Sequence, residues 1–261
     1  MRPSAIEIVK SLLASFAIGT PLAAAQAEPV EVTAEPYLWA PTITGTISLG
    51  TLTVPLDVGP EQLATGVRAG VMGYAKVRKG NALVATEVIA ADFRRDKFAP
   101  LLGQNVAAKI ASIEGEAGYQ IVSSTRMTVS PFVGIRYNYL KARAGTAPAR
   151  IAVLGEWIEP LIGLNGAARL ADRWHAHFKI NHGLGVTTQR SFDVRGDIDY
   201  RISTRFSVFA GWRHSDHFYR NSGGTPFGLD LHGDGPLLGA RTVLGATRHG
   251  NLIDKGPFQR P

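Results

Sequence analysis

The chain has 261 residues, of which 45% are hydrophobic and 19% are charged, with a formal net charge of +7 and no cysteine. This composition excludes a disordered chain, which combines low hydrophobicity with high net charge. The lack of cysteine excludes a disulfide scaffold, a cysteine-based zinc site and a thiol nucleophile. Lys and Arg are scattered without a long basic run, and no nucleic-acid-binding module is recognisable, so we expect no nucleic-acid partner.

Residues 1–27 have the layout of a secretory signal peptide. Arg2 and Lys10 give a positive start, an apolar stretch follows, and Ala25-Gln26-Ala27 matches an A-x-A cleavage site. A membrane anchor is the alternative, but a spanning helix needs about 20 apolar residues and this stretch is shorter. We therefore predict an exported protein with a cleaved signal, a folded part over residues 28–246 and a tail over residues 247–261.

Beyond the signal, apolar and polar residues alternate with period two. In segment 127–140, Val133 and Ile135 share one face, whereas Arg136 and Asn138 share the other. We predict strands over 30–49, 67–78, 81–93, 106–122, 127–142, 156–170, 173–187, 191–203, 205–217 and 228–246. Longer loops are predicted over 52–66, 94–105, 144–155 and 218–227, and the remaining connections are short turns.

Two architectures place apolar and charged residues on opposite faces of a sheet. A soluble antiparallel sheet turns its apolar face inward, and a transmembrane barrel turns it outward. The apolar faces here are rich in Gly and Ala, Tyr and Trp cluster near strand ends, and an export signal is present, which together favour the barrel. We predict an all-β, closed, antiparallel up-and-down transmembrane β-barrel of about ten strands, with eight or twelve as alternatives. The aromatic residues predicted for the membrane interfaces are Tyr37, Trp39, Tyr137, Tyr139, Trp157, Trp174, Tyr200 and Trp212.

Several short motifs follow one another along the chain. They are Pro36-Tyr37-Leu38-Trp39-Ala40 with Gly45-Thr46, Gly134-Ile135-Arg136-Tyr137, Glu159-Pro160-Leu161-Ile162-Gly163, Gly211-Trp212-Arg213-His214 and Gly235-Pro236-Leu237-Leu238-Gly239. In order and spacing they resemble the motifs of an uncharacterised family of proteobacterial outer-membrane β-barrel proteins. The resemblance covers nearly the whole mature chain, and it implies a barrel of this size without an established activity. The sequence departs from many such barrels at its end, because a tail with Pro257 and Pro261 follows the last strand in place of a terminal aromatic residue.

On the predicted register the inward faces carry as many acidic as basic side chains. They are Lys76, Glu87, Glu114, Glu116, Arg136, Glu159, Arg169, Lys179, Asp193, Arg195, Asp197, Asp199, Arg201 and Arg213. The lumen of a ten-stranded barrel is narrow enough for side chains to fill it, and an unpaired charge inside costs several kcal/mol. Two arrangements fit, namely an interlocked ion-pair core that braces the wall or a narrow pore of mixed charge.

Histidines offer the remaining candidates for chemistry. His175 and His177 share one strand face, but a metal site would need a further ligand from another strand, so we predict polar lumen residues. Ser215 follows His214 directly, and because neighbours in a strand point to opposite faces they cannot form a triad by themselves. No G-x-S-x-G motif occurs. We predict no catalytic residue, no metal and no cofactor.

These observations predict a non-enzymatic barrel, structural or narrow-pored, in the outer membrane of a Gram-negative bacterium. Its expected partners are outer-membrane lipid, lipopolysaccharide and the barrel assembly machinery. Two alternatives stay open: a membrane-embedded lipid-modifying hydrolase, and a soluble periplasmic binding barrel of lipocalin type.

Overall fold

A computed structural model describes residues 30–49, 52–98, 104–146, 149–185, 189–221 and 226–244. The signal peptide predicted over residues 1–27 and the tail predicted over 247–261 lie outside the described residues. Among the described helical residues, none belongs to a helix long and apolar enough to cross a membrane.

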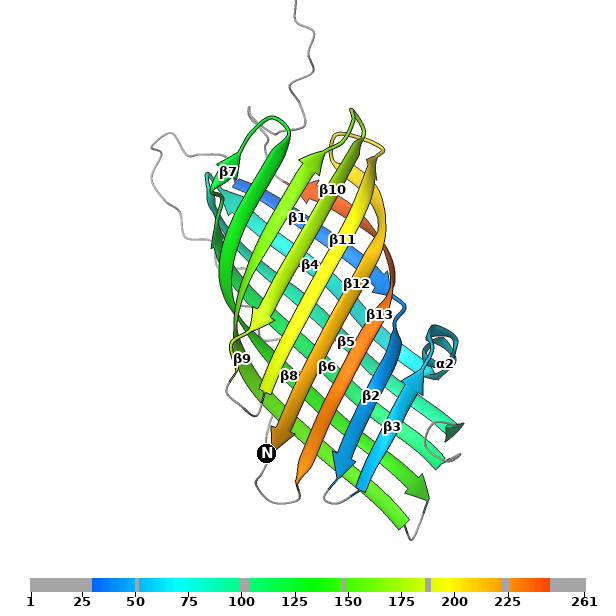
Figure 1. The fold of residues 1–261 in the computed structure, drawn as a ribbon. Helices are drawn as coiled ribbons and strands as arrows, with labels where there is room; N and C mark the ends of the chain where they lie inside the picture. Colours follow the sequence, from blue (N-terminus) through cyan, green and yellow to red (C-terminus); the bar gives the residue numbers. More distant parts are fainter. Residues whose placement is uncertain are drawn as a thin grey trace, which may run out of the picture.

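Ten strands form a closed antiparallel barrel, as predicted (Figure 1). They are β1 (Val30–Trp39), β4 (Val67–Lys79), β5 (Ala82–Phe98), β6 (Gln104–Tyr119), β8 (Met127–Thr146), β9 (Ala149–Arg169), β10 (Trp174–Gly183), β11 (Gln189–Arg201), β12 (Phe206–Asn221) and β13 (Phe227–Leu244). Neighbours in this order pair with one another, and β1 closes the ring by pairing with both β4 and β13. A closed ring leaves its backbone groups paired, which is the condition for a sheet in hydrocarbon. Three strands are additional: β2 (Thr42–Leu49), β3 (Leu52–Val58) and β7 (Val122–Ser123).

The two ends of the barrel differ. At one end, called here the short-turn end, the connections are the brief segments 80–81, 170–173 and 202–205, together with the segment that contains β7. The tightest turn is Gly80-Asn81, where Gly80 has φ of 56°, a left-handed conformation that glycine adopts without strain. The opposite end, called here the far end, carries β2, β3 and the helix α2 (Pro60–Gly66).

The strand predicted over residues 30–49 is broken, so that prediction was wrong in detail. β1 ends at Trp39 and β2 begins at Thr42, because Pro41 has no N–H to donate to the ladder. The N–H of Ala40 donates to the carbonyl of Pro236 at 3.0 Å and bridges the break. β2 then continues along the same neighbour, with Thr42 opposite Asp234. β13 therefore pairs with β1 towards the short-turn end and with β2 towards the far end.

The segment predicted as a loop over residues 52–66 contains β3 and α2, and the loop prediction was wrong. β3 holds Pro55 opposite Thr46, and proline is tolerated there because within the described residues β3 pairs with β2 alone. The wall of the far half thus has a seam between β3 and β4. Beside it, α2 is tied to β5 by Arg95, whose guanidinium donates to the carbonyl of Gln62 at 3.1 Å.

The strands reach further towards the far end than the sequence predicted. Much of the loops predicted over 94–105, 144–155 and 218–227 is strand in β5, β6, β8, β9, β12 and β13. The pattern of apolar outward and polar inward side chains is lost there, since the outward Arg94 on β5 is charged and the inward Val153 on β9 is apolar. Period-two patterning marks only the part of a strand that separates an apolar from a polar environment.

An apolar band surrounds the outside of the barrel. Leu38, Val133 and Leu238 are 75%, 62% and 62% exposed, far more than large aliphatic side chains facing the core of a soluble protein would be. On β9 the outward side chains run without a charge from Leu170 to Ile158. A strand tilted by about 40° rises about 2.5 Å per residue, so on β9 the band is about 30 Å tall, close to that of a transmembrane barrel.

The depth of this band predicts where an outward charge is tolerated. We expect Val133→Arg, in the middle of the band, to lower the free energy of unfolding in lipid vesicles by about 2–4 kcal/mol, and Leu170→Arg, at its short-turn margin, by about 0–1 kcal/mol. Urea unfolding of both variants in vesicles measures the two values. Equal costs at the two positions would contradict the placement of the band.

Candidate functional site

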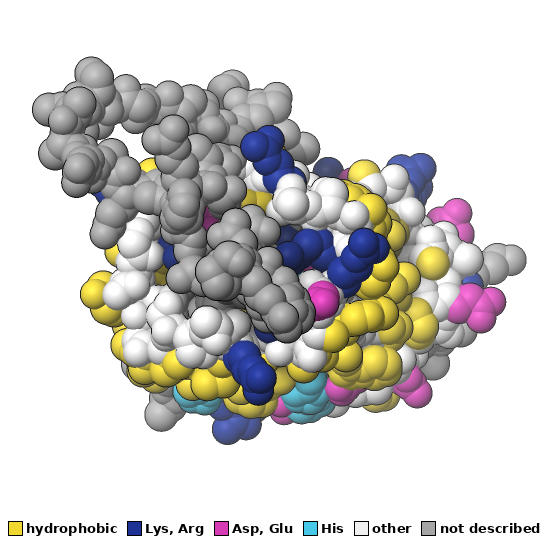
Figure 2. All heavy atoms as spheres, turned by 90° about the horizontal axis from the view of Figure 1, so that it is seen from above, with side chains coloured by type: hydrophobic (Ala, Val, Ile, Leu, Met, Phe, Trp, Pro, Cys, Tyr) yellow, Lys and Arg dark blue, Asp and Glu magenta, His cyan; other side chains and the backbone are white. Residues whose placement is uncertain are grey.

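The inside of the wall is lined by charged side chains. The structure places all fourteen predicted lumen charges on the inward faces. Four charged side chains that were not predicted also line the lumen: Glu31 and Glu35 on β1, Arg78 on β4 and Arg241 on β13. Viewed from the short-turn end, basic side chains gather towards the middle of the described part and hydrophobic side chains around its margin (Figure 2).

Arg136 on β8 lies at the centre of one group of buried contacts in the lumen. Its guanidinium donates to Glu114 on β6 at 2.7 Å and to Glu159 on β9 at 3.3 Å. It also donates to the side chains of Asn181 on β10 at 2.8 Å and Ser191 on β11 at 2.9 Å. Arg136 is 2% exposed and Glu159 1%, so a single buried cation links five consecutive strands of the wall.

Lys179 and Arg213 extend this group of buried contacts. The Lys179 ammonium on β10 lies 2.9 Å from Glu87 on β5, 2.9 Å from Glu114 and 2.6 Å from Glu116. On β12, Arg213 contacts the second oxygen of Glu87 at 2.9 Å. We call Glu87, Glu114, Arg136, Lys179 and Arg213 the central layer. Because β5 and β10 are not neighbours in the sheet, the Lys179–Glu87 contact crosses the lumen.

A second group of ion pairs lies on the short-turn side of the central layer. Glu35 accepts from Arg241 at 2.7 Å and from Arg195 at 3.0 Å. Arg241 donates further to Asp197 at 3.1 Å and Asp199 at 3.0 Å. β1 and β11 are thereby joined through the interior, although they are not paired in the sheet.

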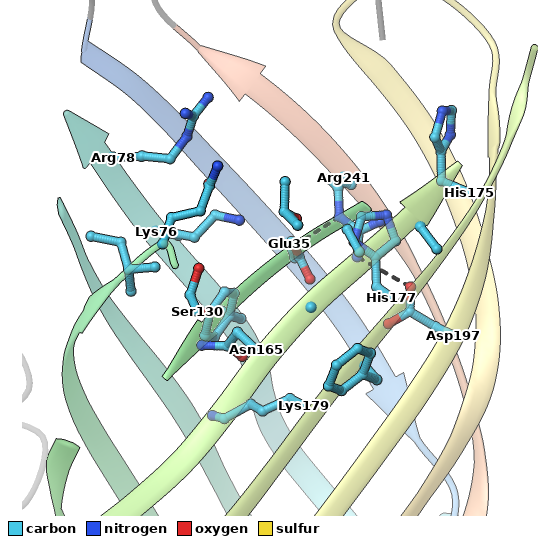
Figure 3. Close-up of a pocket in the computed structure, with 18 of the residues that line it drawn as sticks. Glu35, Lys76, Arg78, Ser130, Asn165, His175, His177, Lys179, Asp197 and Arg241 are labelled. Atoms are coloured by element: carbon cyan, nitrogen blue, oxygen red, sulfur yellow. Dashed lines mark hydrogen bonds and ion pairs between the residues drawn. The ribbon is translucent and has the colours of Figure 1, made fainter. Parts of the chain in front are cut away.

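Two cavities occupy the lumen, one on either side of the central layer. The short-turn cavity has a volume of about 190 Å³ and a lining of mixed polar and apolar surface, with Lys76, His177 and Arg241 among its lining residues (Figure 3). The far cavity has a volume of about 180 Å³ and is largely apolar above a polar floor. The cavities share no lining residue, because the central layer separates them.

The two predicted lumen histidines belong to the short-turn cavity. His177 Nε2 lies 2.6 Å from Asp199, and His175 Nε2 lies 3.0 Å from the guanidinium of Arg201. They lie among ion pairs, and the described residues contain no group of three or more His, Asp or Glu side chains placed to hold a metal ion. The geometry suits hydrogen bonding and ion pairing.

Three of the eight predicted interface aromatics face the lumen, so their placement at the membrane interface was wrong. Tyr37 is buried and its hydroxyl donates to Glu87 at 2.6 Å. Trp39 and Trp157 line the far cavity, and Trp157 stacks on Tyr219 with ring centroids 4.3 Å apart. The signal that would have placed them was available, since Tyr37 and Trp39 share the face of Glu35, and Trp157 shares that of Glu159.

The other five interface aromatics lie on the outward faces of their strands: Tyr137, Tyr139, Trp174, Tyr200 and Trp212. Trp174 and Tyr200 lie together at the short-turn margin of the apolar band, with ring centroids 4.9 Å apart. Trp212 is 55% exposed on β12 and lies nearer the far end. These positions flank the band as an aromatic girdle does.

A chain of alternating acids and histidines, which the sequence analysis missed, runs along the outside of β12 and β13. His214 lies 2.9 Å from Asp234 and 3.1 Å from Asp216, and Asp216 lies 2.6 Å from His232. These side chains begin just beyond Trp212, where the apolar band ends. Ser215, between His214 and Asp216 in sequence, is buried on the inward face, so the serine and His214 are separated by the wall.

The apolar outer band and the charged interior give this chain its class. It has the architecture of an outer-membrane β-barrel protein. No protein-family model matches the sequence, and no curated protein sequence matches it.

Several solved structures align with this chain at low sequence identity. The outer membrane protease OmpT of Escherichia coli aligns with a TM-score of 0.49 and 9% identity, covering 85% of this chain and 99% of that chain. Ail of Yersinia pestis aligns with a TM-score of 0.34 and 10% identity, covering 83% and 99%. Neisserial surface protein A aligns with a TM-score of 0.31 and 11% identity, covering 82% and 96%.

Removing one member of the central layer is expected to destabilise the barrel strongly. Arg136→Met leaves Glu114 and Glu159 without their guanidinium, and an uncompensated buried charge costs about 3–5 kcal/mol. Arg126→Met, in an exposed turn, is the control and is expected to change the free energy of unfolding by less than about 0.5 kcal/mol. Urea unfolding in vesicles compares them, and a loss below about 1 kcal/mol for Arg136→Met would contradict this role.

Proposed function

We propose that this protein is a non-enzymatic barrel of the Gram-negative outer membrane whose lumen is closed by paired charges, so that its role is structural and not that of a conducting pore. The observation that carries the proposal is the central layer, whose five side chains are each at most 5% exposed. Those side chains reach across the lumen and separate two cavities that have no lining residue in common. An ion crossing the barrel would have to break several buried ion pairs at once.

The orientation of the faces distinguishes this proposal from a soluble lipocalin-like barrel. Such a barrel keeps its apolar side chains inside and its charges in water. Here Ile135 and Ile158 are 62% and 61% exposed on the outside, whereas Glu114 and Asp193 are 2% and 0% exposed inside. An outside of this kind is stable in contact with acyl chains.

A non-enzymatic role is supported by the placement of the residues that suggested a hydrolase. Ser215 faces the lumen and His214 faces outward on the same strand. His177 and His175 take part in interactions with Asp199 and Arg201. The interior polar groups therefore act mainly on one another.

The orientation in the membrane and the lipid partner follow from the two ends. Short turns are typical of the periplasmic side of such barrels, and longer strands and loops of the outer side, so we assign the short-turn end to the periplasm. Beyond the apolar band at the far end, Lys109 faces outward directly opposite Lys141, with Arg143 one outward position further along β8. Lys109 pairs with Asp92 at 3.4 Å, whereas Lys141 and Arg143 at that level complement the phosphates of lipopolysaccharide, which supports it as a lipid partner. The export signal predicted over residues 1–27 and the five sequence motifs fit the same assignment.

Bilayer recording tests whether the lumen is closed. We expect the protein to give no stable conductance steps in about 1 M KCl. At this ionic strength the Debye length is about 3 Å, so charges on the protein surface are largely screened. The double variant Glu114→Ala/Arg136→Ala removes a balanced pair from the central layer and is expected to conduct.

The matched control is Glu31→Ala/Arg78→Ala. This pair has an N–O distance of 2.8 Å but lies at the short-turn end, outside the central layer, and its removal is expected to leave the protein silent. Heat-modifiable migration on gels checks that every variant is folded. Steady conductance of the unaltered protein would overturn the closed lumen and favour the narrow pore.

A further inference from the structure

One cation of the short-turn cavity differs from the others in its contacts. Lys76, on the inward face of β4, makes no ion pair and no hydrogen bond within the described part of the chain. The other cations that line this cavity are all ion-paired: Arg78, Arg169, Lys179, Arg195 and Arg241. An unpaired charge inside a protein is costly, so the Lys76 ammonium needs solvent or a ligand anion beside it.

The carboxylates that line this cavity are occupied by other cations. Glu31 accepts from Arg78 at 2.8 Å, and Glu35 accepts from Arg241 at 2.7 Å. Asp197 also contacts Arg241, at 3.1 Å. None of these three carboxylates lies within ion-pair distance of the unpaired ammonium, so the lining leaves one positive charge without an acidic partner.

Uncharged donors line the same cavity. Figure 3 shows Lys76, Ser130 and Asn165 on one side of the cavity, opposite the ion pairs of β11 and β13. Ser130 and Gln120 are 5% and 8% exposed and make no side-chain hydrogen bond within the described residues. Their polar atoms are open to the cavity that they line, because neither side chain is among those whose unpaired polar atoms are fully enclosed. The Ser130 hydroxyl and the Gln120 amide can therefore both donate to a ligand.

The remaining uncharged polar groups of the lining fall into two sets. The hydroxyls of Tyr74, Ser123 and Thr128 also make no hydrogen bond within the described residues and add further donors. The amide of Asn165 donates to Glu116 at 3.0 Å, and both histidines hydrogen-bond to charged side chains. The lining thus offers one unpaired positive charge and several unused hydroxyl and amide donors.

This combination suits a small oxyanion. The Lys76 ammonium would repel a cation, and an uncharged molecule would leave that ammonium unpaired. The oxygens of a phosphate or carboxylate group accept from ammonium, hydroxyl and amide groups, and such hydrogen bonds are stronger when one partner is ionised. A volume of about 190 Å³ is sufficient for an ion of this size together with water.

We propose that the short-turn cavity binds a small oxyanion, whose charge pairs with Lys76 and whose oxygens accept hydrogen bonds from Ser130 and Gln120. The anion enters from the short-turn end, because Arg78, Ser123 and Arg169 line the cavity and lie next to the short turns.

This binding activity goes beyond the structural role and does not depend on it. The site lies entirely on the short-turn side of the central layer, so steady conductance of the protein would overturn the closed lumen and leave the site intact.

Equilibrium dialysis of radiolabelled anions against the purified protein in a non-ionic detergent tests the site. Inorganic phosphate and acetate are the probes, in sodium chloride at about 0.15 M so that attraction to exposed charges is largely screened. We expect saturable binding of at least one probe at a single site per chain. The probe that binds more tightly identifies phosphate or carboxylate as the preferred group.

Lys76→Met removes the charge. Because Lys76 has no partner among the described residues, we expect this variant to fold, which heat-modifiable migration checks. Its affinity for the anion is expected to fall at least about tenfold. Lys79→Met is the matched control, since it removes one positive charge from the outward face of the same strand, and it is expected to leave the affinity unchanged.

Ser130→Ala removes a donor and keeps every charge, and it is expected to lower the affinity about three- to tenfold. Ser207→Ala is its control, because this buried inward hydroxyl does not line the cavity. Three results would overturn the proposal: no saturable binding of either anion, undiminished affinity in Lys76→Met or Ser130→Ala, or an equal loss in Lys79→Met, which would show only attraction to net charge.

Discussion

A charge enclosed by ten strands has little water to solvate it, so each ionised side chain in this lumen needs a partner on another strand. Arg136 meets that requirement with contacts to Glu114 and Glu159 on its two neighbouring strands, and Lys179 meets it across the lumen with Glu87. Such pairs are costly to break and contribute little net stability over apolar packing. Their main consequence here is geometric, because they hold opposite walls at a fixed distance and leave two separate cavities.

The same pairs fix the register of the strands. Side chains alternate faces, so a slip of one residue on β11 would move Asp193, Arg195 and Asp197 from the lumen to the acyl chains and bring Val194 and Ile198 inside. Both changes are unfavourable. The outward apolar band and the inward ion pairs therefore both favour the same pairing of the strands.

The sequence allowed the closed barrel and the inward charges to be predicted, because alternation is strong wherever a strand separates lipid from a charged interior. The same rule, applied to the aromatics, would have sorted them as well. Tyr37 and Trp157 share a face with Glu35 and Glu159 and lie inside, whereas Trp212 lies on the face opposite to that of Arg213 and is outside. Position near a strand end misled the prediction for Tyr37, Trp39 and Trp157, since lumen and interface both accept an aromatic ring with a polar edge.

Other features depend on contacts that no local pattern encodes. The break at Pro41, the edge strand β3 and the helix α2 lie where the chain leaves β1 and pairs with the far half of β13. The strand extensions at that end carry charged outward side chains, such as Arg94 on β5. Glu35 and Arg241 were missed although alternation places both on inward faces, Glu35 with Tyr37 on β1 and Arg241 with Leu237 on β13. The unpaired ammonium of Lys76 is a property of the assembled cavity.

The orientation of the faces is tested most directly by fluorophore labelling, since the chain has no cysteine of its own. Single cysteines at Ile113 and Val133, which face outward on β6 and β8, and at Ile110 and Ser130, which line the cavities on the same strands, are labelled with an environment-sensitive dye in vesicles of brominated lipid. The account predicts strong quenching by bromine at positions 113 and 133 and little at 110 and 130. The reverse alternation, or equal quenching at all four positions, would contradict a barrel with its charges inside.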